Sequence, residues 1–250
     1  MLNSSEVNMN NRYSRHISLK EVGDQGQDRL LKKTIFILGL GGIGSPAALY
    51  LASSGIGRLV LNDFDLIDES NLSRQILFNE SDLGNLKVDV VKKKLNAINS
   101  NLKVDTIDEK LSVNEYSKII SKTSFVLDCS DNFETRLSIS QAAYESNIPI
   151  IHGSAIRFEG QLVVFLNNGK GPCYSCVYSD NEWLENCQGN GVLSTVPGLI
   201  GLMMTSELLK IIFGIKSQLV NILLLWDLKD NTWKKLNIKP NPNCKICSRC

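Results

Sequence analysis

The chain has 250 residues, of which 43% are hydrophobic, and its 27 lysines and arginines nearly balance its 26 aspartates and glutamates. This length and apolar content suit one α/β domain with a single sizeable core. A net charge of +1 gives no electrostatic signature of a nucleic-acid-binding or membrane-surface protein, so we expect neither partner. Residues 1–16 are polar, and no run approaches the ~18 uninterrupted apolar residues of a membrane span. We therefore expect a cytoplasmic protein.

The first part of the chain predicts an arm followed by a βαβ unit. After a polar terminus at 1–11, residues 12–33 have the mixed apolar and charged spacing of a short helical arm. Residues 34–38 predict a buried strand, glycines and a helix of small residues follow, and residues 58–62 predict a second strand.

The alternation of helices and strands continues after this unit. A helix is predicted at 86–98, a strand near 104–107 and another strand in SFVLDCSDN at 124–132. Such alternation is typical of a parallel, doubly wound sheet. Residues 149–165 carry strand signals around a turn at 159–160, so the second half of the sheet is predicted to change to antiparallel pairing.

The C-terminal part combines a loop, a helix and a hairpin. Residues 178–193 are polar and rich in glycine and asparagine, which indicates a mobile crossover loop. A strongly apolar helix and a closing hairpin follow, at 199–213, 220–227 and 232–238. We predict one Rossmann-like domain over 1–250, with an arm at 1–33, a core at 34–165 and a cysteine-bearing part at 173–250.

Four of the seven cysteines form two CxxC pairs, Cys173 with Cys176 and Cys244 with Cys247. In a reducing compartment such pairs indicate metal binding before disulfides. Two thiolate pairs complete a tetrahedral zinc site with no open position, so the predicted zinc is structural. A redox CxxC is the alternative, although a redox motif needs only one pair next to a helix. Cys250 is left over and is expected to be inert.

A glycine fingerprint follows the first predicted strand. Gly39, Gly41 and Gly44 have the spacing GxGxxG, and Asp63 ends the next strand. The glycines let the backbone approach a phosphate, the helix offers N–H groups, and the acid accepts from a ribose hydroxyl. By itself this fingerprint favours a nicotinamide or flavin cofactor over ATP, and a glycine turn without a ligand is a further alternative.

The residues after this acid change the interpretation. Asn71, Arg74 and Gln75 follow closely, and Lys87 opens the next helix. An enzyme that cleaves ATP between the α and β phosphates needs such cations, because negative charge builds on the departing pyrophosphate. Asp131 follows a later strand at the carboxyl edge of the sheet and is a candidate magnesium ligand. The alternatives are solvated surface charges for the cations and a helix cap for Asp131.

The motifs RYSRH, GLGGIGSPAALYLASSGIG, DFD, SNLSRQ, GNLK, LDCSDN, PCYSC and PNCKIC occur in this order between residues 12 and 247. Together they resemble the ThiF/MoeB/HesA family, the bacterial relatives of ubiquitin-activating enzymes. The PAALYLA helix and the segment SDNEWLENCQGNGV look most like the ThiF branch, which acts in thiamine biosynthesis.

The resemblance implies an adenylyltransferase that uses ATP and Mg²⁺ to activate the C-terminal Gly-Gly carboxylate of a ubiquitin-like sulfur-carrier protein. The same reaction on a carrier of molybdenum cofactor biosynthesis is the nearest alternative. An NAD-dependent oxidoreductase and a non-catalytic scaffold are more distant ones. A cysteine desulfurase-type sulfur donor is an implied partner.

The resemblance also implies residue roles. Arg15 of the arm would reach the ATP of a neighbouring subunit, which makes the expected assembly a homodimer. Cys187 would form a covalent link with the carrier, unless it is a passive loop cysteine, and His16 and His152 are expected to be structural. The implied nucleotide-site residues are Gly39, Gly41, Gly42, Gly44, Asp63, Asp65, Ser70, Asn71, Leu72, Ser73, Arg74, Gln75, Lys87, Asp131 and Asn132, with Arg15, Arg74, Lys87, Asp131 and Cys187 in catalysis and Cys173, Cys176, Cys244 and Cys247 on zinc.

Overall fold

The computed structural model describes residues 12–169, 171–178 and 191–249. Within them, eight strands form one sheet. The strands are β1 Thr34–Leu38, β2 Arg58–Asn62, β3 Lys103–Ile107, β4 Phe125–Asp128, β5 Ile150–Ile156, β6 Glu159–Phe165, β7 Ile222–Asp227 and β8 Thr232–Asn237. Their order in space is β3-β2-β1-β4-β5-β6-β7-β8.

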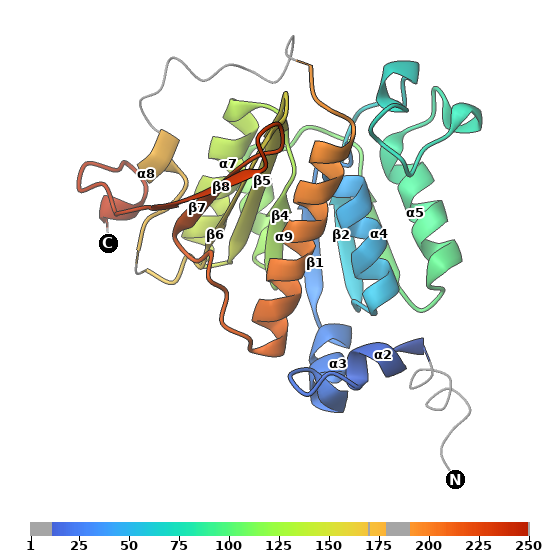
Figure 1. The fold of residues 1–250 in the computed structure, drawn as a ribbon, viewed down its shortest axis with the longest axis horizontal. Helices are drawn as coiled ribbons and strands as arrows, with labels where there is room; N and C mark the ends of the chain where they lie inside the picture. The colour runs from blue at the N-terminus through green and yellow to red at the C-terminus, as the bar shows by residue number, and fades with distance from the viewer. Residues whose placement is uncertain (1–11, 170, 179–190, 250) are drawn as a thin grey trace.

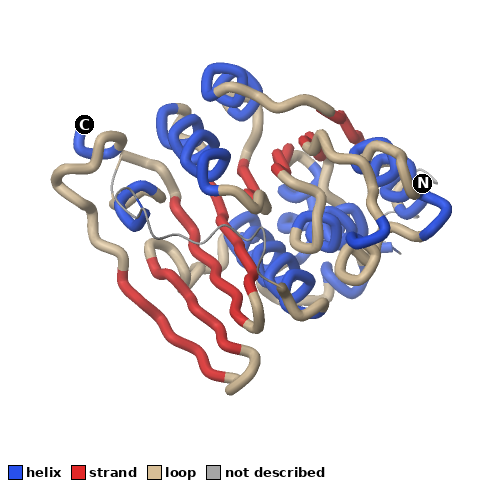
Figure 2. Tube along the Cα trace, turned by 90° about the horizontal axis from the view of Figure 1, so that it is seen from above, coloured by secondary structure: helices blue, strands red, loops and turns tan. Residues whose placement is uncertain are grey.

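The sheet has a parallel half and an antiparallel half. Strands β1 to β5 pair in parallel, whereas β5 to β8 pair antiparallel. In Figure 2 the antiparallel strands extend as a twisted ribbon away from the main group of helices. The predicted doubly wound sheet with an antiparallel second half is therefore confirmed.

Helices cover both faces of the sheet. The described helices are α2 Ser14–Ile17, α3 Gly23–Leu31, α4 Gly44–Ser54, α5 Lys87–Ile98, α6 Val113–Ile120, α7 Phe133–Glu145, α8 Ser175–Tyr178 and α9 Thr195–Phe213. Figure 1 shows α9, α4 and α5 in front of the sheet, and their apolar residues join one buried cluster. Helices α6 and α7 supply a second cluster on the opposite face.

Strand β1 shows why the sheet is buried on both faces. Side chains alternate along a strand, and Ile35 and Ile37 join the first cluster while Phe36 and Leu38 join the second. All four are buried. A continuous apolar run in the sequence is the expected pattern for such a strand.

The hairpin between β5 and β6 corrects one prediction. Ile156 pairs with Glu159, so the turn consists of Arg157 and Phe158 and not of residues 159–160. Arg157 takes the positive φ of 53° that the turn requires. Gly160 lies within β6. The position requires a glycine because α9 packs against it, and a Cβ there would come within 2.5 Å of Ile200.

Helix α9 begins at Thr195, earlier than the predicted start at 199. Its 19 residues include a window with a mean hydropathy of 1.6, which would suit a membrane span by length and composition. In the structure it packs against α3, α4, β5 and β6. Its apolar composition is therefore explained by burial in a core. The predicted arm at 12–33 is helical but divides into α2 and α3.

Candidate functional site

A cleft of about 910 Å³ opens at the carboxyl ends of β1, β2 and β4. Here the strand order reverses, with β2 on one side of β1 and β4 on the other. Open α/β sheets bind ligands at this switch point, and the volume lies within the ~300–1,000 Å³ of small-molecule sites. Predicted residues that line the cleft are Gly39, Gly41, Gly42, Asp63, Asp65, Asn71, Ser73, Arg74, Gln75, Lys87, Asp131 and Asn132. Gly44, Ser70 and Leu72 do not line it.

The glycine turn holds α4 against the end of β1. Gly39 has a φ of +85°, and a Cβ on Gly44 would come within 1.8 Å of the carbonyl oxygen of Gly39. The N–H of Leu40 donates to Asp63 Oδ2 at 2.6 Å. The turn therefore depends on the backbone approach that only glycine allows, and Asp63 fixes it from the next strand.

Gly44→Ala is expected to destabilise the fold by about 4 kcal/mol or more, because the new methyl group would meet backbone atoms that cannot move aside. Gly198 in α9 is the matched control, since a Cβ there meets nothing within 4 Å. Gly198→Ala should leave stability unchanged or raise it by up to about 1 kcal/mol. Urea unfolding followed by circular dichroism measures both, and equal midpoints for the two variants would contradict the packing role of Gly44.

Two carboxylates and one ammonium group meet beside the turn. Lys87 Nζ lies 2.7 Å from Asp65 Oδ2, and its side chain is only 5% exposed. Burial raises the pKa of Asp63, while the charge of Lys87 and the N–H groups of Leu40 and Asp65 oppose the rise. This group therefore places a desolvated cation and hydrogen-bond acceptors together at the cleft wall.

The segment after β2 presents Arg74 and Gln75. Asp68 caps a short 3₁₀ helix, Glu69–Asn71, by accepting from Ser70 N and Ser70 Oγ at 2.9 and 2.6 Å. Arg74 Nη1 then donates to the carbonyl oxygen of Ser70 at 2.9 Å. Ser70 thus supports Arg74 from outside the cleft. Gln75 is 3% exposed, and its Oε1 has no partner among the described residues.

The turn after β4 presents Asp131. Asn132, not Asp131, caps α7, because its Oδ1 accepts from the N–H of Thr135 at 2.9 Å. The alternative of a capping role for Asp131 is therefore wrong. Among described residues its exposed carboxylate has no hydrogen-bond or ion-pair partner, and it lines the cleft. A carboxylate in this state suits a divalent cation.

Arg136 was missed by the sequence analysis. It also lines the cleft, and its Nε and Nη2 donate to the carbonyl oxygen of Ser130 at 3.0 and 2.6 Å. A sequence signal for Arg136 was available: the arginine follows closely after Asn132, at the start of the helix that follows β4.

Two predicted catalytic residues lie elsewhere. Arg15 is exposed on α2, which packs on α3, and Figure 1 shows both helices below the beginning of β1. Arg15 is therefore at the end of the sheet opposite to its own cleft. Cys187 and most of the predicted crossover loop lie outside the described residues.

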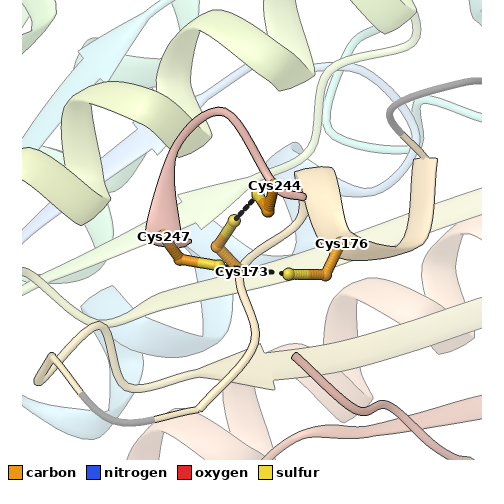
Figure 3. A group of neighbouring side chains, drawn as sticks. All are labelled: Cys173, Cys176, Cys244 and Cys247. Carbon is orange, nitrogen blue, oxygen red and sulfur yellow. Dashed lines mark hydrogen bonds between the residues drawn. The ribbon is translucent and has the colours of Figure 1, made fainter. Parts of the chain in front are cut away.

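The four predicted metal ligands converge. Figure 3 shows Cys173 and Cys176, beside and on α8, facing Cys244 and Cys247 near the C-terminus. All four Sγ atoms lie within 4.8 Å of one another, with Cys173–Cys244 at 3.6 Å and Cys176–Cys247 at 3.2 Å. A disulfide would need about 2.05 Å. Tetrahedral zinc with ~2.3 Å bonds separates its sulfurs by about 3.8 Å, so the cluster fits zinc.

The pKa values of three of these thiols are shifted. Burial and the neighbouring thiol groups raise the pKa of Cys247 to about 12 and also raise the pKa of Cys173, whereas hydrogen bonds from the backbone N–H groups of Cys247 and Ile246 lower the pKa of Cys244 against its burial. Thiolates cannot gather in this space without a positive charge. Bound zinc supplies that charge and keeps the ligands deprotonated.

The fold, the cleft and the cysteine cluster define a doubly wound α/β protein with four cysteines positioned to bind a metal and a polar cleft at its switch point. A sequence model described as "ThiF family" matches residues 13–246. The chain belongs to the ThiF family.

Three relatives match nearly the whole of this chain, and two of them also match over nearly their own whole length. "Sulfur carrier protein ThiS adenylyltransferase" of Escherichia coli (strain K12) is 38% identical and covers 94% of both chains. "Sulfur carrier protein adenylyltransferase" of Thermus thermophilus is 34% identical and covers 94% of this chain and 90% of its own. "Adenylyltransferase and sulfurtransferase MOCS3" of Xenopus laevis is 39% identical, and the chain spans only 53% of that protein.

Solved structures give the same fold. The crystal structure of E. coli MccB with AMPCPP and MccA has a TM-score of 0.82 and 25% identity, and covers 97% of this chain and 76% of that one. The crystal structure of PaaA has a TM-score of 0.79 and 28% identity, with 96% and 76% covered.

Proposed function

We propose that this chain is an adenylyltransferase that uses ATP and Mg²⁺ to activate the C-terminal Gly-Gly carboxylate of a ubiquitin-like sulfur-carrier protein. The observation that carries the proposal is the gathering of Arg74, Lys87 and Asp131 on one cleft at the switch point of the sheet. The names of the relatives, which include the ThiS adenylyltransferase of E. coli, support the same activity.

The cleft residues fit a nucleotide. We assign the ribose to Asp63, whose carboxylate lies at the end of β2 beside the glycine turn, and the phosphates to Arg74 and Lys87. Gln75 Oε1, buried without a partner among the described residues, is an acceptor for a hydroxyl or amino group of the ligand. Asp131 is the magnesium ligand in this assignment, because Mg²⁺ prefers carboxylate and phosphate oxygens. Bound magnesium supplies charge neutralisation at the phosphates.

The reaction requires positioning more than proton transfer. A carrier carboxylate oxygen attacks the α-phosphorus of ATP, the bond from that phosphorus to the bridging oxygen breaks, and its electron pair leaves with pyrophosphate. No general base is needed because the carboxylate is already ionised. Lys87 exchanges its ion pair with Asp65 for phosphate oxygens in this step and stabilises the charge on the leaving group.

We assign the carrier to thiamine biosynthesis, since the ThiS adenylyltransferase matches over 94% of its own length. A carrier of the molybdenum cofactor pathway is the alternative, which the MOCS3 relatives support over half of their length. Incubating the enzyme and ATP–Mg²⁺ with each purified carrier, followed by mass spectrometry, separates the two. The true substrate gains the mass of an adenylate, and the absence of any adenylated carrier would refute the function.

We place sulfur transfer after adenylation, with a cysteine desulfurase-type donor and with Cys187 as the residue that links to the carrier. In that link the Cys187 thiolate attacks the carbonyl carbon of the carrier's acyl-adenylate, the bond from this carbon to the phosphate oxygen breaks, and AMP leaves. The same mass spectra test this step, because a conjugate at Cys187 has the combined mass of enzyme and carrier less one water. We place the enzyme in the cytoplasm, where the thiols of the four-cysteine cluster stay reduced.

We further propose a homodimer in which Arg15 of one chain serves the cleft of its partner. Arg15 lies at the opposite end of the sheet from its own cleft, so it has a role there only across an interface. The adjacent helices α4 and α9 expose an apolar face, on which Tyr50 is 52% and Leu199 36% accessible and Leu202 and Met203 are half-buried. Such a face favours association with a second copy.

Subunit complementation tests this arrangement. Arg15→Ala and Lys87→Ala chains should each be inactive alone, because each variant lacks one cation at every site. Mixed and re-equilibrated chains form one intact site in each heterodimer, so about a quarter of wild-type exchange activity should return. Pyrophosphate exchange into ATP measures the recovery, and no recovery in a verified heterodimer would contradict the shared site.

A further inference from the structure

A buried carboxylate lies directly behind the candidate magnesium ligand. Asp128 ends β4, and its side chain is fully buried. Its Oδ1 accepts from Ser130 N at 3.0 Å and from Ser130 Oγ at 2.7 Å, and its Oδ2 lies 2.6 Å from His152 Nδ1. A carboxylate only accepts, so Nδ1 of His152 carries the proton in this pair.

His152 is held on its other sides by aromatic rings. It stands opposite Asp128 in the register of β4 and β5, and its side chain is 6% exposed. Its ring packs on Tyr174 with centroids 4.3 Å apart, and Phe165 meets it edge-on at 5.9 Å. Tyr174 belongs to the segment between Cys173 and Cys176. The imidazole therefore packs on a ring from the segment that carries two of the four clustered cysteines.

Ser130 is the point at which these contacts reach the cleft. Its N–H and Oγ are bonded to Asp128, and its carbonyl oxygen accepts from Arg136 at 2.6 Å. The backbone N–H, the hydroxyl group and the carbonyl oxygen of Ser130 each therefore form a hydrogen bond. The next residue along the chain is Asp131, whose own carboxylate has no partner among the described residues to orient it.

We infer that Asp128 and His152 are positioning residues for adenylation, which fix the turn at Ser130 and thereby hold the Asp131 carboxylate where magnesium is bound. The inference rests on the proposed function, because it concerns the residues that support Asp131, the magnesium ligand assigned there. Supporting hydrogen bonds of this kind tune metal sites through the ligands that they orient.

The charges agree with this arrangement. Burial opposes ionisation of Asp128, but the facing imidazole of His152 and the donors from Ser130 hold its pKa below the ordinary value. The group is therefore an ionised carboxylate with fixed donors on both oxygens. Charge-assisted hydrogen bonds are about twice as strong as neutral ones, which suits a rigid support.

Two substitutions of His152 distinguish a specific effect on the position of Asp131 from a general loss of folding stability. His152→Phe keeps a ring on Tyr174 but removes the donor to Asp128. His152→Asn removes the ring but keeps a donor close to the place of Nδ1. Both should lower Tm, whereas only the phenylalanine variant should disturb the turn at Ser130.

ATP binding measured by titration calorimetry, with and without Mg²⁺, provides the readout. For His152→Phe we expect about a tenfold loss in the magnesium-dependent part of ATP affinity, with affinity in the absence of Mg²⁺ unchanged. His152→Asn should restore most of the loss. Equal magnesium dependence in the wild type and both variants would overturn the inference while leaving the proposed function intact. Wild-type protein that binds no ATP would overturn both.

Ser130→Ala decides the question if His152→Phe does not fold. This variant removes only the hydroxyl donor to Asp128 and keeps the N–H. Loss of one hydrogen bond should weaken the magnesium-dependent part of ATP binding about threefold. Magnesium dependence identical to that of the wild type would overturn the inference.

Discussion

Replacing Lys87 with alanine is expected to lower ATP–pyrophosphate exchange by about 10²–10³-fold, the usual cost of removing one charge-stabilising group from an active site. The effect should be large because the ammonium is desolvated, with its side chain 5% exposed, and lies at the cleft wall. Without it, Asp63 and Asp65 face the phosphates uncompensated. The loss should appear in kcat as well as KM, since charge on the departing pyrophosphate is greatest in the transition state.

Lys94 is the matched control for this experiment. It is on the same helix, α5, but pairs with Asp82 and donates to the carbonyl oxygen of Leu77, away from the cleft. Lys94→Ala should therefore keep most of the exchange activity. Thermal unfolding establishes that both variants are folded, and a Lys87→Ala variant as active as Lys94→Ala would refute the assignment.

The parallel half of the fold could be predicted closely because its signals are local. The runs at 34–38 and 58–62 match β1 and β2 to the residue. Each run has an apolar centre, as expected for strands in the middle of a sheet that is covered on both faces. The turn of the β5–β6 hairpin was predicted at 159–160 instead of at Arg157 and Phe158, because Gly160 looks like a turn residue in sequence. The structure gives another reason for this glycine: Ile200 of α9, which is distant in sequence, leaves no room for a side chain at position 160.

The candidate site was predictable where residues cluster in motifs and less so where tertiary contacts decide. Asp131 follows closely after the end of β4, and Arg74 and Lys87 belong to the motifs that follow β2, so the motifs indicated that these residues share one cleft. Sequence cannot tell which side chains support others. The role of Ser70 beneath Arg74, and the pairing of Asp128 with His152, emerge only from the geometry of the turns and the register of β4 and β5.

The metal cluster is expected to control the stability of the C-terminal part. All six residues of β8 are exposed. Among the described residues, the small cluster around Cys173 and Cys244 has only Tyr144 as a further buried member, with Ile246 partly buried against it. Apolar burial therefore contributes little to holding residues 238–249 in place. A metal bound by the four thiolates would join this segment to α8, and its binding free energy would then become free energy of folding.

Cys244→Ser is expected to abolish zinc binding and to lower stability by about 4–5 kcal/mol, a size typical of losing a structural metal. For a chain of this size the loss corresponds to a fall in Tm of roughly 8–20 °C. Lys245→Ala is the matched control, because Lys245 lies in the same loop with an exposed side chain and no thiol. Metal analysis should find about one zinc per wild-type chain, and a strong chelator should reproduce the effect of Cys244→Ser. If the metal-free wild type melts at the temperature of the loaded protein, metal binding by the cluster is not what stabilises residues 238–249.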